Sequence, residues 1–567
     1  MEPERAVAGV TPELLAAVRA RIAAAVLPAA AHYFGPPDAG PDDPALERGQ
    51  WAAVYFDYRP CCVSALAALA AGGDERAFRL VRERFAATRF YLDEWRVREG
   101  SPRPVRRAHL HLVLAYERLR DRLEAAEDAT WRDLLVRSAE DILEHVRAFQ
   151  ERQPALDNRA FGTGINHIAV MAEGIWMTGE VLGRPEWQQL AGDFVDRLVA
   201  AMHPDGYFEE HTNDAREGGP SLNYTALTAG CAYLVQRWRG AVDRDRFVRA
   251  GLFFRQFVGP WLRPMPFIDE RANPTHLNVY GLALHALTPE GRGFLRLALD
   301  PHVGGAMAID VERLNLEALG RLALELDHLP CGEGAVPEPF REGAFRLTLP
   351  AAVARSHGWT MGLSALSALN REILPRSIWA LDRQCLVSLT HETAGDLLAG
   401  VKSKHDALWS TVRLGEDAYP TQTGTLTLEG GRARARVRYD RFAAEVSWHY
   451  GALPRLVITS DTRRPLRAQL VLEAPPGSRL VLDGGRTATL GETSEEWDQV
   501  RSVASDSWTV TADRTGRLVW PVSPFNPYSA GNVSPPQRAA RCSPWNGRSA
   551  SSSASRHTVH ATHDADE

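Results

Sequence analysis

The stretch His203–Gly230, HPDGYFEEHTNDAREGGPSLNYTALTAG, separates two helical patterns of the chain. It is long, polar and rich in Gly, Asp and Asn, and such a loop inside a compact domain usually carries function. A second polar cluster, Gly162–Ala169 (GTGINHIA), holds Asn166 and His167. We expect the two stretches to meet in one cleft. The longer stretch brings His211, Tyr224 and the carboxylates Asp205, Glu209 and Glu210 into one loop region.

Length and composition bound the class of protein. A chain of 567 residues is too long for one ordinary hydrophobic core, so two or more domains are expected. The formal net charge of -6 gives no sign of a basic surface for nucleic acid. The 6 cysteines form no CxxC pair, so neither a disulfide framework nor a zinc cluster is indicated. We expect no metal, no cofactor and no nucleic-acid partner, and the sequence leaves a homo-oligomer open.

The N-terminal segment bears on location. Residues 1–35 lack the layout of a signal peptide, because acids stand at positions 2 and 4 and arginines break the apolar stretch. We find no run of the roughly 18 apolar residues that a membrane-spanning helix needs. The sequence therefore predicts a cytoplasmic protein that does not contact a membrane.

A helical apolar period runs from Ala45 to about Leu326. The absence of a short exact repeat argues against a solenoid, whereas paired helices joined by loops suit an α/α toroid whose loops build a cleft at one end. We predict this toroid over residues 45–340, after an N-terminal helix and loop in residues 1–44. One clear apolar helix face comprises Trp131, Leu135, Ile142, Val146 and Phe149.

The apolar period changes after about Phe340. Residues 345–350 (FRLTLP) and 351–356 (AAVARS) are strand-like, and Gly362–Asn370 is interpreted as a last short helix. We interpret residues 341–383 together as a linker between the helical region and a region rich in strands.

From Gln384 onward the alternation typical of strands dominates. In Arg432–Tyr439 arginines interleave with apolar residues, which is the pattern of a half-buried antiparallel strand. We predict an antiparallel β-sandwich over residues 384–534. Residues 535–567 are rich in Ser, Arg and His and contain few apolar residues, so we predict a disordered tail.

Several motifs resemble those of polysaccharide lyases. Asp205–Thr212 (DGYFEEHT) and Leu222–Thr225 (LNYT) resemble the DG-x-F-x-x-H-T…Y-T pattern of hyaluronate and chondroitin AC lyases. Thr163–His167 (TGINH) resembles their T-G-A-N motif and the Asn-His pair of alginate and heparinase II/III-type lyases. Ile268–Ala272 (IDERA) resembles the arginine-bearing loop that follows the tyrosine, and Leu398–Val412 resembles a strand pair of heparinase II/III-like proteins. The His-x-His metal-binding segment of heparinase II-type sandwiches is not found.

The resemblance implies cleavage of an acidic polysaccharide or oligosaccharide by β-elimination at a uronic acid. It implies that Asn166, with His167 or His211, neutralises the uronate, because donors aimed at developing negative charge are usually the largest catalytic term. Tyr224 would take the C5 proton and protonate the leaving oxygen. A phenol has a pKa near 10, so without cations such as Arg271 nearby Tyr224 would be only the acid, and a histidine the base. We predict that Arg271, Asp269, Glu210 and His391 bind the substrate.

Each of these residues also has an ordinary structural explanation. Asn166 can be an N-cap, Tyr224 a core aromatic, Asp205-Gly206 a turn and His391 a strand end. Two other functions stay open. One is a carbohydrate-binding protein that kept the fold and lost activity. The other is an inverting glycoside hydrolase with two carboxylates across the cleft, for which the candidates are Asp205, Glu209, Glu210 and Asp269.

Overall fold

The structure, a computed structural model, divides into two compact units. The first comprises Met1–Gly218, Asn223–Phe254 and Asn278–Val336, and the second comprises Gly219–Leu222, Arg255–Leu277 and Pro337–Glu567. The residues that the structure describes are 9–34, 63–85, 105–152, 165–208, 220–265, 267–268, 277–366, 386–398, 411–414, 422–439, 441–462, 466–474, 477–491, 493, 495–520, 539–543 and 555–562.

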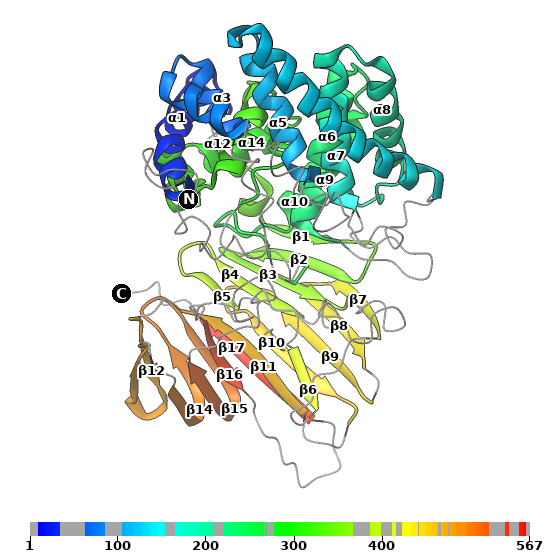
Figure 1. Ribbon diagram of the computed structural model, residues 1–567. Coiled ribbons are helices and arrows are strands. Elements are labelled where there is room, and N and C mark those ends of the chain that lie inside the picture. The colour runs from blue at the N-terminus through cyan, green and yellow to red at the C-terminus, as the bar shows by residue number, and fades with distance from the viewer. Residues whose placement is uncertain are drawn as a thin grey trace. The chain divides into compact units, whose positions relative to one another are not determined.

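The first unit is helical throughout its described residues, apart from turns and an isolated bridge between Val10 and Gly332. The predicted apolar period is confirmed in α6, where Trp131, Leu135 and Ile142 are all buried. The longer helices are α1 Pro12–Phe34, α3 Val63–Ala71, α5 Val105–Leu119, α6 Ala125–Arg152, α7 Ile165–Leu182, α8 Pro185–Ala200, α9 Leu222–Trp238, α10 Arg244–Gln256, α12 Pro289–Leu299 and α14 Leu316–Asp327, with the short α11 Leu282–His285 and α13 Pro301–Gly304 between them (Figure 1).

Side-chain caps explain where several of these helices begin. The Thr288 hydroxyl accepts a hydrogen bond from the Gly291 amide at the start of α12. The Asn315 side chain does the same for the Ala318 amide at the start of α14. Each cap satisfies a backbone donor that the helix itself leaves unpaired, so these polar residues define the helix ends.

Helix α1 differs from expectation. By length and composition alone, its segment Pro12–Ala31 is apolar enough to cross a membrane, a property that was not expected from the sequence. In the first unit, however, α1 packs against α14 and α3. Arg19 pairs with Asp327 at 3.2 Å and Arg21 pairs with Glu312 at 2.8 Å. We interpret α1 as a packed helix of this unit.

The second unit is an antiparallel sandwich. One ladder runs β1–β2–β3–β4–β5–β11 and another runs β7–β8–β9–β10–β17–β15, and all these pairings are antiparallel. Side chains from both ladders share one hydrophobic core. The strands are β1 Gly343–Arg346, β2 Ala351–Ser356, β3 Trp359–Ser364, β4 Val387–His391, β5 Gly395–Leu398, β6 Thr411–Leu414, β7 Thr423–Glu429, β8 Arg432–Arg438, β9 Ala443–His449, β10 Arg455–Ser460, β11 Leu466–Glu473, β12 Arg479–Leu482, β13 Thr487–Thr489, β14 Glu495–Ala504, β15 Thr509–Trp520, β16 Ala539–Ser543 and β17 Ser555–Thr562.

The predicted linker and its short helix are wrong where the structure describes them. Residues 343–364 form β1, β2 and β3, so strands begin well before Gln384. All residues of β3 are buried, so no polar alternation marks it as a strand. A side chain at Gly362 would overlap the Phe267 ring, so a glycine is needed there. The rest of the predicted helix, residues 367–370, lies outside the described residues.

The predicted disordered tail is also wrong for its described residues. Ala539–Ser543 is β16, which pairs with β11 and β15. Ser555–Thr562 is β17, which lies between β10 and β15. Backbone pairing satisfies the amides and carbonyls of a strand whatever its side chains are, so a polar composition did not reveal these strands.

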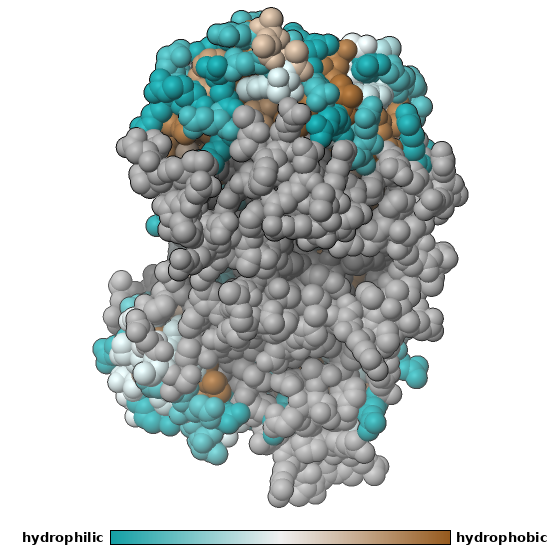
Figure 2. Space-filling model, in the orientation of Figure 1, coloured by the Kyte–Doolittle hydropathy of each residue, from teal (hydrophilic) through white to brown (hydrophobic). Residues whose placement is uncertain are grey.

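Exposed apolar side chains are scattered over the described surface. The face of the first unit in Figure 2 is mainly hydrophilic, with isolated hydrophobic residues between the polar ones. Among the described residues, the exposed large hydrophobics are Val303, Leu453 and Val481. They are distant in sequence, and single exposed apolar residues are normal on a protein surface.

Candidate functional site

Part of the predicted site is described. Asn166 is the second residue of α7 and is buried, with 4% of its surface exposed, whereas the next residue, His167, is half-buried. Tyr224 is the third residue of α9 and is half-buried. His391 lies in the second unit. The predicted site residues outside the described part of the chain are Glu209, Glu210, His211, Asp269 and Arg271.

Two side-chain contacts relate α7 to α9 and show that the helices run in the same direction. Burial and the nearby carboxylate of Glu173 on α7 raise the pKa of the Cys231 thiol on α9. Further along both helices, the rings of Trp176 and Trp238 stack with their centroids 5.2 Å apart. From the first contact to the second, the chain runs toward the C-terminus in both helices. The two helices therefore begin at the same end of the first unit.

This packing relates the start of one helix to the start of the other. Asn166 lies seven residues before Glu173, and Tyr224 lies seven residues before Cys231. At about 3.6 residues per turn, seven residues make nearly two turns and return to almost the same helix face. The faces of α7 and α9 that meet at Glu173 and Cys231 therefore carry Asn166 and Tyr224 at their N-terminal ends.

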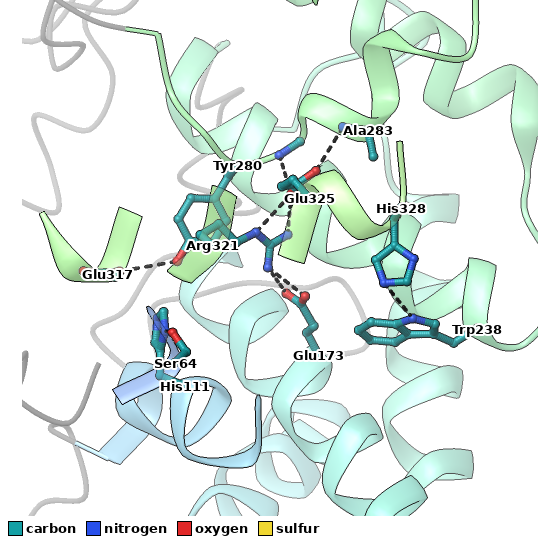
Figure 3. Close-up of polar contacts among 11 residues, drawn as sticks. Ser64, His111, Glu173, Trp238, Tyr280, Ala283, Glu317, Arg321, Glu325 and His328 are labelled. Carbon is teal, nitrogen blue, oxygen red and sulfur yellow. Dashed lines mark hydrogen bonds and ion pairs between the residues drawn. The ribbon is translucent and has the colours of Figure 1, made fainter. Parts of the chain in front are cut away.

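A buried arginine fixes this arrangement (Figure 3). Arg321 on α14 is fully buried, and its Nη1 lies 2.7 Å from both carboxylate oxygens of Glu173. Its Nε and Nη2 donate to Oε1 of Glu325 at 3.0 and 2.8 Å. Burial lowers the pKa of the Arg321 guanidinium, but the two carboxylates outweigh burial and raise that pKa above its ordinary value. Arg321 therefore stays charged, as a buried ion does when it is fully paired.

The same network holds the segment that leads into α11. The Tyr280 ring lies 4.4 Å from the Arg321 guanidinium carbon. Glu325 accepts hydrogen bonds from the amides of Gly281 and Ala283, both at 2.9 Å. Figure 3 shows Tyr280, Arg321 and Glu325 together at this point. The segment is thereby fixed directly after residues 269–276, which include two predicted site residues.

A second contact ties this segment to the start of α9. Asn278 Nδ2 donates to the backbone carbonyl of Asn223 at 3.2 Å, one residue before Tyr224. The first turn of α9, the middle of α7 at Glu173 and the chain from Asn278 onward are thus joined by one set of contacts.

The Asp-Gly pair of the long loop forms a tight turn. Gly206 has φ +93, and a Cβ there would lie 2.4 Å from the Arg249 carbonyl oxygen, so only glycine fits. Asp205 Oδ2 lies 3.6 Å from His203 Nδ1 within the same turn. The Phe208 amide donates to the Thr225 hydroxyl at 3.1 Å, which brings the turn to the first turn of α9. Asp205 therefore has a structural role in this turn.

His391 is buried and is the last residue of β4, directly before the turn to β5. Its ring centroid lies 4.5 Å from that of Trp359. Its Nδ1 accepts hydrogen bonds from the amides of Thr393 and Ala394, both at 3.3 Å. The His391 side chain therefore stabilises the turn, which explains why a histidine is found at this position.

The buried charges were not predicted from the sequence. Glu173 stands in the otherwise apolar stretch of α7, IAVMAEGIWM, which was a signal that it needs a buried cation. Arg321 and Glu325 have the spacing of four residues that lets side chains on one helix pair. Among the described residues, no group of three or more His, Cys, Asp or Glu side chains is arranged to hold a metal ion.

Comparison with known proteins gives the fold. No family model and no curated protein matches the sequence. The structure of Streptomyces coelicolor A3 chondroitin AC lyase in complex with chondroitin sulphate is similar, with a TM-score of 0.55 and 13% identity over 97% of this chain and 80% of that chain. A mutant of heparan sulfate lyase HepC from Pedobacter heparinus has a TM-score of 0.50 and 11% identity over 93% of this chain and 78% of that chain. The chain therefore has the fold of these polysaccharide lyases, a helical toroid unit followed by antiparallel β-structure.

Proposed function

We propose that the protein is a lyase that cleaves an acidic polysaccharide or oligosaccharide by β-elimination at a uronic acid. The observation that carries the proposal is the common direction of α7 and α9, with Asn166 and Tyr224 at equivalent positions two turns before Glu173 and Cys231. The shared fold supports the same class of reaction.

The proposed chemistry begins with the uronate carboxylate. The proton on C5 is too weakly acidic to leave while the neighbouring carboxylate is fully charged. The Asn166 amide would donate a hydrogen bond to that carboxylate, and the bond would strengthen as negative charge develops. Two helix N-termini begin at this end of the unit, and their partial positive charge favours an anionic group there.

Tyr224 is the proposed acid and base. As a base it would remove the C5 proton, and as an acid it would protonate the leaving O4 oxygen of the neighbouring sugar. A tyrosine base near neutral pH needs neighbouring cations, and His211 and Arg271 are proposed for that role. The alternative is that Tyr224 acts only as the acid and His167 or His211 is the base.

The substrate is proposed to be a glycosaminoglycan or a related uronate-containing glycan. The similar structures are of enzymes named for chondroitin and heparan sulfate, which differ in their sugars. The proposal covers a chondroitin AC-type and a heparinase II/III-type specificity alike. The cytoplasmic location stays a prediction, under which imported oligosaccharides would be the substrates rather than whole polymers.

A substrate screen tests the proposal. The purified chain is incubated with hyaluronan, chondroitin, heparin, alginate, ulvan and pectic fragments at several pH values. β-Elimination leaves an unsaturated sugar that absorbs in the near ultraviolet, whereas a glycoside hydrolase leaves only new reducing ends. A protein that only binds carbohydrate produces neither signal.

The variant Tyr224→Phe tests the site itself. It removes one hydroxyl, so the fold should survive while kcat falls by roughly 10²–10⁴-fold. The matched control is Tyr450→Phe in the second unit, which should leave kcat unchanged. Equal turnover by Tyr224→Phe and the unmodified chain on a confirmed substrate would refute the assignment of this site.

A further inference from the structure

One exposed face of the second unit carries a row of arginines. In β8, Arg434, Arg436 and Arg438 are exposed, while the alternating residues Ala433, Ala435 and Val437 are buried in the core. Arg432 begins the same row and is half-buried. Same-face residues of a strand are about 6.8 Å apart, so the four guanidinium groups span roughly 20 Å of strand. Figure 1 shows β7, β8 and β9 side by side.

A row of hydroxyls flanks the arginines. On β7, Thr423, Thr425 and Thr427 are exposed. The register places them directly opposite Arg438, Arg436 and Arg434, respectively. Cationic and hydroxyl side chains therefore form two parallel rows on a continuous surface, which we call the arginine face.

The acids on this face neutralise only one end of it. Glu445 on β9 stands directly opposite Arg436, but its carboxylate lies 3.2 Å from Arg434 and 3.9 Å from Arg432 and pairs with those two guanidinium groups. Glu429 stands opposite Arg432. Within the part of the chain that the structure describes, Arg436 and Arg438 have no ion-pair partner. The row therefore keeps an excess of positive charge.

Neither stability nor protection of a sheet edge explains this row. Like charges two residues apart on one strand face repel each other, which opposes folding slightly. Charged residues often guard sheet edges against unwanted pairing, but β8 is not an edge, because β7 and β9 pair with it on its two sides. A periodic row of exposed cations is suited to binding an anionic ligand.

We propose that the arginine face binds an acidic polysaccharide chain as a second site, apart from the candidate catalytic site. The planar guanidinium fork matches carboxylate and sulfate groups with two hydrogen bonds each. The threonine hydroxyls would bond to sugar hydroxyls beside them. A linear polymer that repeats its anionic groups matches a linear row of cations.

Single-stranded nucleic acid fits this face less well. Such binding combines a cationic groove with aromatic side chains on which bases stack. The described residues of β7, β8 and β9 that share the arginine face include no Phe, Tyr or Trp. The choice of a polysaccharide as the polyanion rests on the proposed function, whereas binding of a polyanion follows from the face alone.

The test compares two charge-matched variants of the full chain. The first replaces Arg434, Arg436 and Arg438 with glutamine. The second replaces three arginines scattered over other strands of the same unit, Arg346, Arg479 and Arg514, with glutamine. Both variants lose three positive charges, and circular dichroism and melting temperature confirm that both are folded. Binding to heparin dodecasaccharide and to chondroitin sulphate chains is measured by calorimetry at several salt concentrations.

We expect the first variant to bind these glycans roughly 3- to 100-fold more weakly, which is the range for three exposed charge contacts, and with a shallower salt dependence. The scattered variant should change affinity less than 2-fold. Equal losses in both variants, or no loss in the first, would overturn the inference. Equally tight binding of a single-stranded DNA oligonucleotide to the unmodified chain would overturn the polysaccharide assignment. Binding does not require turnover, so this test can be carried out even if the chain cleaves no glycan. A failure of the proposed function can therefore be distinguished from a failure of this inference.

Discussion

Arg321 and Glu173 form an ion pair in the interior of the first unit, with Arg321 Nη1 2.7 Å from both carboxylate oxygens and neither side chain exposed. Glu325 takes the other edge of the guanidinium. Because Glu173 also lies near Cys231 and helps to raise the pKa of its thiol, the pair connects α14, α7 and α9. The relative position of Asn166 and Tyr224 therefore depends on buried charges two turns away from them.

Removing one member of this ion pair should destabilise the first unit strongly. Glu173→Gln leaves the Arg321 charge buried with one carboxylate fewer, so we expect the free energy of unfolding to fall by about 3–5 kcal/mol. Urea denaturation followed by circular dichroism measures the change. The control is Arg313→Gln, because the Arg313 side chain is 87% exposed in its ion pair with Asp310. This substitution should lower the free energy of unfolding by less than about 0.5 kcal/mol. Similar losses in the two variants would contradict the central role of the pair.

Two substitutions at Asn166 should separate its charge effect from its shape, once a substrate is known. Asn166→Ala removes the donor to the uronate and should lower kcat by roughly 10²–10³-fold, the usual effect of losing one such donor. Asn166→Asp keeps the shape but adds a negative charge beside the substrate carboxylate, so it should lower kcat as well and also raise KM. Steady-state kinetics measures both constants. If the kcat and KM of Asn166→Asp are as good as those of Asn166→Ala, the residue does not face the substrate carboxylate.

His109 should make stability depend on pH. Its side chain is fully buried between Ser138 Oγ at 2.6 Å and Thr178 Oγ1 at 2.8 Å, and burial lowers the pKa of His109 to about 3. The ordinary pKa in the unfolded chain is about 6.5, so below that pH the unfolded state gains a proton that the folded state does not. The stability from a neutral His109 is thus complete above about pH 6.5 and is lost progressively as the pH falls toward 3.

Urea denaturation at pH 7.5 and pH 5 tests this dependence against His109→Gln. The variant is less stable at pH 7.5 because it loses one or both hydrogen bonds, but it has no imidazole to protonate. We expect its disadvantage to shrink by about 2 kcal/mol at pH 5, at 1.4 kcal/mol for each pH unit below 6.5. The exposed His302→Gln is the control for losing any histidine. An equal stability difference between His109→Gln and the unmodified chain at both pH values would show that His109 does not cause the pH dependence.

The sequence predicted those features that are local in the chain. The period of α6 and the alternation of β8 follow from residues a few positions apart, and the structure confirms both. The pairing of Arg321 with Glu173 joins residues 148 positions apart, which no local period can reveal. β3 and β17 were missed for opposite reasons, since the first is buried on both faces and the second has a polar composition.

The residues of the candidate site were predicted in a different way. Asn166 and Tyr224 were singled out by motif resemblance, and the helix packing that relates them became visible only in the structure. For the predicted site residues outside the described part of the chain, His211 and Arg271 among them, the sequence remains the basis of the prediction.

The last strand gives a prediction that replaces the expectation of a disordered tail. β17 pairs with β10 from Arg455 to Ser460 and with β15 from Thr509 to Ala512. Removing residues 544–567 would leave both strands with unpaired backbone groups in the interior of the ladder. At about 0.5–1.5 kcal/mol for each lost hydrogen bond, the second unit should lose several kcal/mol of stability. The newly exposed strand edges should also promote aggregation.

A shorter truncation is the matched control for that experiment. Removing only residues 563–567 leaves β17 complete and should not change the melting temperature. Thermal unfolding followed by circular dichroism, with light scattering to detect aggregates, compares the two truncations with the full chain. We expect only the longer truncation to melt several degrees lower and to scatter light on heating, because only that truncation removes a strand paired on both sides. Equal melting temperatures for all three chains would mean that β17 does not contribute to the stability of the sandwich. That result would favour the disordered tail predicted from the polar composition.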